Sequence, residues 1–538
     1  MTLNILGQNM LSIPQRLLGE ALLNSASEYP DKTAIIVKNK EYSYSQLKSS
    51  AIIIASHLVS NGLKKDDRVA VYMNNSWECI VSIYGITIAG AAFIVINPQT
   101  KADKLRYILS DSGTKVLLAE AGLKHDILPA VENAAELTEV IIYGSTDQFQ
   151  KGSYPIMSEF EDIISSEISA DLPRIIPNDL AALIYTSGST GFPKGVMMTH
   201  QSMVFTSWSL IEYLRLSRED RILTVLPFSF DYGLYQLLLA ITIGGTLIVE
   251  QSFLLPKFIY HQIQLYRPTV FPAVPTMYAM MIEDHKHSGI SFNCIQKITN
   301  TAAALPAEYL PHLRTIFPNA FIFKMYGLTE CKRVCYLEPE LIDLKPNSVG
   351  KAIPGTEVFL LSPEGNPVSP GEKGILYIRG PHVMLGYWNK PELSKEMLRQ
   401  GKLPYERILC SNDWFTMDEE GFLYFHGRTD DIIKSRGQKI SPVEIENTLH
   451  NISGVKEAAV IGIPDKSLGE AIIAYVCLLD KNSLNEMTIQ KACLERLEFF
   501  MLPNQFIFID EMPKNSNGKI DKLILKETYL ILSDMLKK

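Results

Sequence analysis

The chain has 538 residues, more than one hydrophobic core usually serves, so two or more domains are expected. Hydrophobic residues make up 46% of the sequence and charged residues 20%, a balance typical of folded chains that excludes wholesale disorder. The formal net charge of −8 argues against a protein that binds nucleic acid through bulk electrostatic attraction.

Cysteine spacing and the N-terminal segment indicate the compartment. The seven cysteines include no Cys-x-x-Cys pair and no zinc-type Cys/His spacing, so we expect reduced thiols and no disulfide framework. The N-terminal segment lacks the basic stretch, long apolar core and cleavage site of a signal peptide. These features predict a cytoplasmic protein.

Two uncharged apolar stretches, residues 80–96 and 234–249, need weighing as membrane spans. Both contain glycines, and both are shorter than the roughly 20 residues that a membrane-spanning helix needs. Each stretch therefore predicts a buried helix, a glycine turn and a buried strand, and we expect no membrane span.

Along roughly the first 370 residues, short runs rich in β-branched residues alternate with longer helical patterns. This alternation predicts an α/β fold of mostly parallel sheets covered by helices. The expected strands include residues 68–72, 115–119, 140–143 and 246–249, and the expected helices include residues 45–61 and 306–317.

After about residue 370 the pattern changes to short strands separated by glycine and proline turns. From about residue 431 a separate small α/β unit is expected, and its length of about 108 residues is sufficient for an independent domain. We therefore expect a large domain over residues 1–430 and a small domain over residues 431–538. The expected elements are strands 374–379, 421–425, 455–463 and 471–479 and a helix over 443–449.

The most informative segment is Tyr185-Thr-Ser-Gly-Ser-Thr-Gly-Phe-Pro-Lys-Gly195, which follows an apolar run typical of a buried strand. Glycines let the backbone approach a phosphate closely, hydroxyls donate hydrogen bonds and Lys194 adds positive charge. The segment is not a Walker A loop, because that motif has Gly-Lys-Ser/Thr in direct sequence. We predict a phosphate-binding loop here and not a flexible linker. Its nucleotide-binding residues are expected to be Thr186, Ser187, Gly188, Ser189, Thr190 and Gly191.

This loop is similar to the signature of the adenylate-forming superfamily, which includes acyl-CoA synthetases, nonribosomal peptide synthetase adenylation domains and luciferases. Further motifs continue the resemblance in order from about Tyr44 to Lys519. The resemblance implies a large N-terminal domain of helix-covered sheets plus a distorted β-barrel, followed by a small mobile C-terminal α/β domain. It also implies ATP and Mg²⁺ as cofactors and a two-step reaction, in which an acid becomes an adenylate and a thiol then displaces AMP.

Two further motifs resemble nucleotide-binding segments of the family. In Tyr326-Gly-Leu-Thr-Glu330, the resemblance implies that Tyr326 stacks near the adenine and Thr329 contacts the adenylate phosphate. Glu330 would hold Mg²⁺, which prefers a carboxylate together with phosphate oxygens. Ser411-Asn-Asp413 stands where the family has Thr-Gly-Asp, so Asp413 would accept hydrogen bonds from the ribose hydroxyls. Asn412 departs from the usual glycine.

The C-terminal motifs imply a moving domain and a catalytic lysine. In Gly427-Arg-Thr-Asp430, Arg428 would reach the nucleotide and Asp430 would be the residue about which the small domain rotates. Lys519 resembles the lysine that the family uses for adenylation, where an ammonium bridges the attacking carboxylate and the α-phosphate. Lys434 and Gly437 fall on the face presented in the thioester-forming state, although a solvated charge run is the alternative interpretation.

The segment Leu226-Pro-Phe-Ser-Phe-Asp-Tyr-Gly233 bears on the substrate. It has the Phe-Asp of amino-acid-activating members, which implies that Asp231 pairs with a substrate ammonium, because a carboxylate in an apolar pocket is costly without a cation. The alternative is an aspartate that caps the following helix, 232–240. Arg333, close to the pocket, is left unexplained. Other pocket positions carried over, with core packing as the alternative for each, are Tyr232, Tyr235, Ala273, Ile298, Asn300, Met325 and Val334.

These motifs predict an AMP-forming ligase that activates a small acid, specifically an amino acid such as proline, and loads it onto a separate carrier protein. A coenzyme A ligase for a small aliphatic or aryl acid stays open, and Ile96-Asn-Pro98 resembles that class. A silent nucleotide-binding protein is disfavoured, because Lys519 and Glu330 are both present. His285 and His287 have no third ligand in view, so they predict a solvated helix end and not a metal site.

Overall fold

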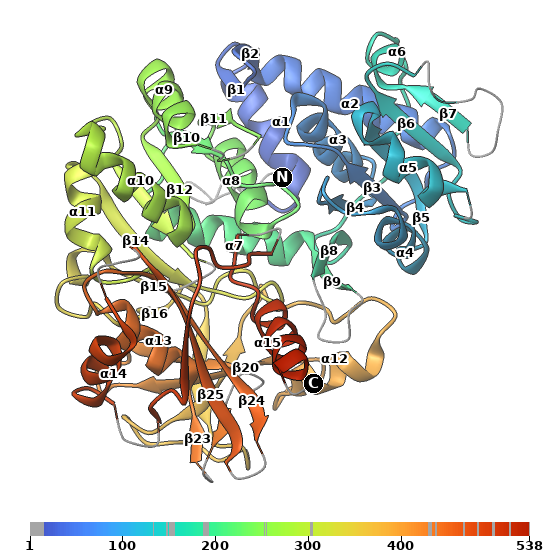
Figure 1. Ribbon diagram of the computed structural model, residues 1–538. Helices are drawn as coiled ribbons and strands as arrows, with labels where there is room; N and C mark the ends of the chain where they lie inside the picture. The colour runs from blue at the N-terminus through green and yellow to red at the C-terminus, as the bar shows by residue number, and fades with distance from the viewer. Residues whose placement is uncertain are drawn as a thin grey trace, which may run out of the picture.

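The structure is a computed structural model (Figure 1). Its described part consists of four β-sheets and their helices. Among the described residues no helix combines the length and the apolar character needed to cross a membrane. All seven cysteines are free, as predicted. The described residues are 15–132, 134–146, 149, 156–186, 193–251, 253, 255–301, 305–428, 433–435, 438–465, 468–480, 484–497, 501–515 and 518–536.

The first sheet has seven strands in the order β7-β6-β5-β3-β4-β8-β9, parallel except for the antiparallel edge strand β9. Its central strand β4 is buried along its whole length, which explains its uninterrupted apolar sequence. The apolar stretch 80–96 divides into the end of α3, a glycine turn and β4, as predicted. The strands are β3 (Arg68–Tyr72), β4 (Ala92–Ile96), β5 (Thr114–Glu120), β6 (Glu139–Tyr143), β7 (Ile156–Glu159), β8 (Leu180–Thr186) and β9 (Lys194–Thr199), with helices α2 (Tyr44–Ser60), α3 (Trp77–Ile88), α4 (Ala102–Ser112), α5 (Lys124–Val131) and α6 (Phe160–Ile164) and a short 3-10 turn at Ala121–Leu123.

The second sheet has nine strands in the order β16-β15-β14-β13-β12-β10-β11-β1-β2, with parallel pairing from β14 to β1 and antiparallel strands at both ends. The strands are β1 (Thr33–Val37), β2 (Lys40–Ser43), β10 (Arg221–Thr224), β11 (Thr246–Val249), β12 (Val270–Ala273), β13 (Lys297–Asn300), β14 (Phe321–Tyr326), β15 (Cys335–Leu337) and β16 (Lys351–Ala352). The helices in this part are α1 (Leu18–Glu28), α7 (His200–Tyr213), α8 (Asp231–Thr242), α9 (Pro256–Tyr266), α10 (Pro275–Ser288) and α11 (Tyr309–Ile316), with a 3-10 turn at Pro339–Leu341.

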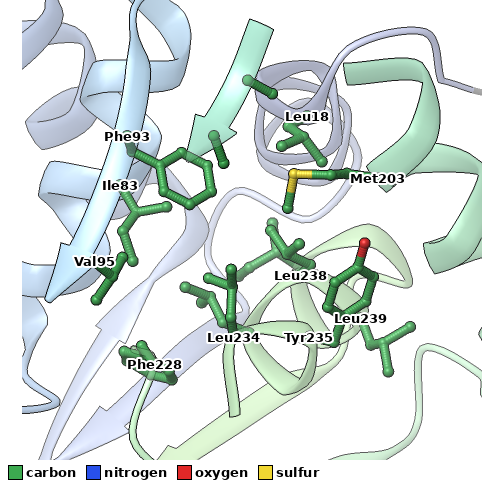
Figure 2. Packing of buried hydrophobic residues seen from close by; sticks show 14 of the residues in the cluster. Leu18, Ile83, Phe93, Val95, Met203, Phe228, Leu234, Tyr235, Leu238 and Leu239 are labelled. Atoms are coloured by element: carbon green, nitrogen blue, oxygen red, sulfur yellow. The ribbon is translucent and has the colours of Figure 1, made fainter. Parts of the chain in front are cut away.

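One hydrophobic cluster joins the two sheets through the helices between them. Figure 2 shows side chains of α3 and β4 facing those of α8, with Leu18 of α1 and Met203 of α7 beside them. Phe93 of β4 and Leu234 of α8 are fully buried there. Burial of this apolar surface fixes the two sheets and the first turn of α8 relative to one another.

The third sheet is open and antiparallel, in the order β17-β18-β20-β19, with β21 paired to β20. The expected distorted barrel is not what the described strands form. The free edge of β21 pairs instead with Gly350, through a bridge to Leu423 that ties this sheet to the segment before β16. The elements are β17 (Glu357–Leu361), β18 (Gly374–Arg379), α12 (Pro391–Met397), β19 (Leu398–Gln400), β20 (Arg407–Met417) and β21 (Leu423–Arg428).

The C-terminal unit, orange to red in Figure 1, has a five-stranded sheet of its own. Two hydrophobic clusters consist entirely of its residues, while the boundary near residue 430 stays a prediction. The elements are β22 (Ile433–Ser435), β23 (Gln438–Ile440), α13 (Pro442–His450), β24 (Val455–Asp465), β25 (Gly469–Leu478), α14 (Glu486–Leu494), β26 (Gln505–Phe508) and α15 (Lys522–Leu536).

Candidate active site

The glycine- and hydroxyl-rich loop begins and ends at one point of the seven-stranded sheet. Thr186 ends β8, Lys194 begins β9, and the two residues are antiparallel partners. The buried Thr186 hydroxyl has no hydrogen-bond partner among the described residues, so it is available to a ligand. Ser187, Gly188, Ser189, Thr190 and Gly191 lie outside the described residues, and their contacts with phosphate stay predictions.

Lys194, Glu330 and Tyr387 form a hydrogen-bonded cluster at the start of β9. The Lys194 ammonium donates to the Tyr387 hydroxyl over 2.8 Å and lies 3.5 Å from Glu330 Oε1. The Tyr387 hydroxyl donates to the same carboxylate oxygen over 2.6 Å. Burial and the Glu330 charge raise the pKa of Tyr387, which keeps this donor protonated. The cluster thus presents an ammonium and a carboxylate side by side, a combination suited to phosphate and its metal ion.

Tyr387 is held in this cluster by the segment 385–388, which runs along the free edge of β9. Two backbone hydrogen bonds of 3.0 Å join Met197 to this segment, and Val196 and Tyr387 are antiparallel bridge partners. Because Lys194 lies two residues before Val196, its side chain shares a face with Tyr387. Sequence reasoning missed Tyr387, since it lies 193 positions from Lys194. The glycine followed by two aromatic residues at 386–388 is the signal that could have drawn attention to it.

The Tyr-Gly-x-Thr-Glu segment forms a tight turn after β14, which ends at Tyr326. The backbone amide of Lys332 closes the turn with a hydrogen bond of 2.7 Å. Gly327 has no room for a side chain, because a Cβ there would lie 2.2 Å from the Lys332 carbonyl oxygen. The turn leaves Glu330 buried and Thr329 half-buried beside it. This placement is compatible with the expected roles of both residues, which stay predictions.

Three predicted nucleotide-binding residues from three elements lie together beyond this turn. The Tyr326 hydroxyl donates to the Asp413 carboxylate, and Asp413 is the cross-strand partner of Arg428, whose Nε lies 3.9 Å from Asp413 Oδ1. The Tyr326 ring packs edge-on against Phe415, with 4.9 Å between ring centres. Burial and the Asp413 charge raise the pKa of Tyr326, so this hydroxyl also stays protonated.

Asn412 stands where the family has a glycine before this aspartate. Its backbone conformation explains why asparagine can replace glycine there. Its φ of +56° lies in the left-handed region, which asparagine adopts more readily than most non-glycine residues. The thiol of Cys410 donates to Asn412 Oδ1 over 3.2 Å. The backbone conformation that glycine permits is thus retained, and Asp413 is directed toward Tyr326.

Lys519 reaches the same site from the C-terminal unit. Burial lowers the pKa of its ammonium from the ordinary value, and the nearby Arg428 acts in the same direction. The carboxylates of Asp231, Asp413 and Glu330 oppose this effect, because each favours the charged ammonium. The structure therefore brings the last motif of the chain within electrostatic reach of carboxylates from three earlier segments.

Asp231 is the first residue of α8, preceded by Phe230 in the N-cap position. The N-cap residue Phe230 supplies no side-chain hydrogen bond, whereas a carboxylate in the first turn is favoured by the helix dipole. The half-buried Asp231 carboxylate acts electrostatically on Lys519 and on the buried Lys332.

The other predicted pocket residues divide between two hydrophobic clusters on opposite faces of the nine-stranded sheet. Neighbouring residues of a strand point to opposite faces, and the register pairs Phe271 with Ile298 on the face toward α10 and α11. Asp231 lies on the other face, where α8 packs. Tyr232, Tyr235, Met325 and Val334 belong to the α8-side cluster, whereas Ala273 and Ile298 belong to the α10 and α11 side, and Asn300 is buried at the end of β13.

The predicted hinge and thioester-state residues are described only in small part. Asp430 and Gly437 lie outside the described residues, and Lys434 is described as the middle backbone position of β22. Their roles stay predictions.

No group of three or more His, Cys, Asp or Glu side chains able to hold a metal occurs among the described residues. His285 contacts the Ile290 carbonyl oxygen at 2.8 Å and His287 lies 4.0 Å from Glu283, so the two histidines do not share a site. A single carboxylate such as Glu330 nevertheless suits Mg²⁺, which completes its shell with phosphate oxygens and water.

Comparisons with known proteins agree with this arrangement. The family model described as AMP-binding enzyme matches residues 22–388, and the model described as AMP-binding enzyme C-terminal domain matches residues 444–519. A long-chain-fatty-acid–CoA ligase of Bacillus subtilis is 31% identical over 96% of this chain and 96% of that protein. One of the linear gramicidin synthase proteins of Brevibacillus parabrevis is 29% identical over 96% of this chain and 6% of its own length. The ATP-bound crystal structure of MatB from Rhodopseudomonas palustris superposes with a TM-score of 0.84 at 26% identity, covering 96% of this chain and 99% of that one. The chain belongs to the AMP-binding enzyme family and is an AMP-forming acid–thiol ligase.

Proposed function

We propose that this ligase activates a short carboxylic acid as its adenylate and transfers the acyl group to the thiol of coenzyme A. The observation that carries the proposal is the placement of Lys519 within reach of Asp231, Asp413 and Glu330. An ammonium at this point can bridge the attacking carboxylate and the α-phosphate, neutralising negative charge as the new bond forms.

The remaining site residues bind and orient the nucleotide. Glu330 would hold Mg²⁺, which neutralises phosphate charge when bound, and Lys194 would contact the phosphates. Tyr387 orients both groups by bonding to Lys194 over 2.8 Å and to Glu330 over 2.6 Å. Asp413 would accept hydrogen bonds from the ribose hydroxyls, with Tyr326 holding its carboxylate in place.

Large side chains on the α8 side support a short acid. Tyr232 and Tyr235 are almost fully buried, and the Tyr232 hydroxyl donates to the Thr299 carbonyl oxygen over 2.7 Å. Tyr213 stacks on Tyr336 with 4.1 Å between ring centres. These aromatic rings fill space that a long acyl chain would need.

The charges around Asp231 favour an acid without an α-ammonium. Lys332 and Lys519 both lie within electrostatic reach of this single carboxylate. A substrate ammonium would therefore share the Asp231 carboxylate with two cations that are already present. The coenzyme A acceptor is supported by the B. subtilis relative, named a CoA ligase, which matches over nearly its whole length.

An amino acid such as proline, loaded onto a separate carrier protein, is the second candidate. Asp231 is the observation that favours it, because its half-buried carboxylate could pair with the ammonium of an amino acid. The similarity to a linear gramicidin synthase protein supports the same alternative.

A pyrophosphate-exchange panel of simple acids and amino acids, followed by discharge onto coenzyme A or a carrier protein, tests both candidates. We expect short acids lacking an amino group to support exchange and acyl-CoA to accumulate with AMP. If an amino acid is preferred, and Asp231→Ala lowers its exchange more than roughly 100-fold, the second candidate is correct. Release of ADP and phosphate, in place of AMP and pyrophosphate, would overturn both.

A further inference from the structure

Two buried cations, Lys332 and Arg333, follow the Tyr-Gly-x-Thr-Glu turn directly. Arg333 is 5% exposed and Lys332 is 2% exposed. Neither makes an ion pair with a carboxylate among the described residues. Lys297 shows the contrast, since this buried lysine of the same sheet pairs with Asp220 over 2.8 Å.

The donors of the two cations are only partly used. Arg333 Nη1 donates to Thr301 Oγ1 and to the carbonyl of Lys332, each over 3.2 Å. Within the described part of the chain, Arg333 Nε and Lys332 Nζ are both buried without a hydrogen-bond partner. Burying a charged side chain with unused hydrogen-bond donors costs free energy. A site that holds two such cations side by side is therefore suited to binding an anionic group of a ligand.

The cations lie on the side of the sheet where the acid is expected. The Arg333 guanidinium lies 5.4 Å from the centre of the Tyr232 ring. It interacts with the Tyr213 hydroxyl through charge and a side-chain hydrogen bond, and it acts electrostatically on Tyr235. Asp231, one residue before Tyr232, acts on both Lys332 and Lys519. Asp231 is thus an electrostatic neighbour both of the lysine expected at the reacting carboxylate and of one member of the buried pair.

We propose that Arg333, with Lys332 beside it, binds a second carboxylate at the far end of the acid, so that the substrate is a short dicarboxylic acid. This inference rests on the proposed function, because the first carboxylate must react at Lys519. The planar guanidinium binds a carboxylate through paired donors, and the free Nε supplies one of them. The second carboxylate would pair with Arg333, whereas Asp231 and Glu330 already act on Lys332.

The direct test compares acids of equal chain length in pyrophosphate exchange with the unmodified protein. Each pair consists of a monocarboxylate and the corresponding dicarboxylate: butanoate and butanedioate, pentanoate and pentanedioate, hexanoate and hexanedioate. The best dicarboxylate is expected to exceed its partner at least about 100-fold in kcat/KM, because the analogue without the second carboxylate leaves buried donors unpaired. A ratio near one for every pair would overturn the inference.

Arg333→Met tests the assignment to this side chain. We expect the dicarboxylate preference to fall below about tenfold, mainly through a higher KM, while ATP affinity measured by calorimetry is unchanged. Lys324→Met is the matched control, because Lys324 is also a buried lysine of this sheet but has the Pro346 carbonyl as its acceptor. It should keep the preference, and an Arg333→Met variant that also keeps it would overturn the assignment.

Two further results keep the outcomes distinguishable. If Arg333→Met does not fold, Arg333→Lys retains the charge without the paired donors and should lose part of the preference, whereas an unchanged preference counts against the site. If no acid supports exchange although ATP binds, the proposed function fails and this inference fails with it. If monocarboxylates are activated as fast as dicarboxylates, only the inference fails.

Discussion

At the residue scale, the site is organised around ammonium groups held near carboxylates. Lys194 lies 3.5 Å from Glu330, and the charges of Asp231, Asp413 and Glu330 act on Lys519. Burial makes each charge costly on its own, so the ammonium and carboxylate groups stabilise one another until a nucleotide arrives.

Lys519→Ala should separate the two half-reactions. Losing one preorganised donor at a point of developing charge typically costs roughly 100- to 1000-fold in rate, so adenylation should fall by about that factor. Discharge of a preformed acyl-adenylate onto the thiol should be largely spared. Single-turnover measurements of both steps decide the matter, and an equal loss in each would contradict the role assigned to Lys519.

Tyr387→Phe should raise the Mg²⁺ requirement. The variant removes the donor that holds Glu330 Oε1, and loss of a partner that orients a metal ligand commonly costs roughly 10- to 100-fold in metal affinity. The Mg²⁺ concentration for half-maximal adenylation should rise by a factor in this range. Tyr424→Phe is the control, because it loses a 3.0 Å hydrogen bond to the Asp418 carboxylate outside the site. An equal shift in both variants would rule out a specific effect.

At the scale of single elements, strand β20 shows how one residue directs a side chain into the site. The positive φ of Asn412 interrupts the regular strand directly before Asp413, which therefore faces Tyr326. Ladder pairing then resumes with Arg428 opposite Asp413. The nucleotide-binding geometry thus depends on a local backbone conformation inside an otherwise ordinary strand.

Asn412→Gly and Asn412→Val should have opposite outcomes. Glycine adopts the left-handed region freely, so ATP affinity should stay within about twofold. Valine is strained there, which should lower the free energy of unfolding by roughly 1–3 kcal/mol and weaken ATP binding. Denaturant unfolding and calorimetry check the pair, and a valine variant as stable as the glycine variant would show that the conformation is unimportant.

Helices and strands could be predicted where short stretches of sequence determine them. The strands expected at 68–72, 246–249 and 374–379 coincide with β3, β11 and β18, because continuous apolar runs between turns determine them. The strand expected at 421–425 begins only at Leu423, since Gly421 turns the chain with a φ of +84°.

The pocket was harder to anticipate than the strands. Ile298 and Tyr232 were expected in one pocket, but they pack on opposite faces of a sheet. Alternation along a strand separates two faces, yet it does not reveal which helix covers each face. Tyr387 was missed because its contact with Lys194 depends on pairing between distant segments.

At the scale of the whole molecule, the structure has the arrangement that adenylation needs. Residues 274–276 and Tyr309 of the large domain line a gap of about 100 Å³ with His450 and residues 518–520 of the C-terminal unit. An ion pair of 3.5 Å also joins Lys373 to Glu444. Thioester formation requires the thiol to reach the adenylate, so these contacts must open if the small domain rotates about Asp430 as predicted.

A disulfide between the two domains should stop the reaction after its first step. A Cβ on Gly518 would lie 3.8 Å from Thr276 Oγ1, close enough for Thr276→Cys and Gly518→Cys to form a bond with a small adjustment. The oxidised variant should adenylate within a few-fold of its reduced form but lose about 100-fold or more in thioester formation. The reduced form controls for strain at Gly518, whose φ is +75°. Equal thioester rates in both forms would argue against rotation.

The segment that positions Tyr387 has a consequence beyond the chemistry of the site. Strand β9 is the last strand of its sheet, and an uncovered edge is a template for pairing with another molecule. Backbone hydrogen bonds from residues 385–388 to Met197 and Gly195 occupy that edge. Substitutions that destabilise the pairing of residues 385–388 with β9 are therefore expected to promote aggregation and to weaken phosphate binding.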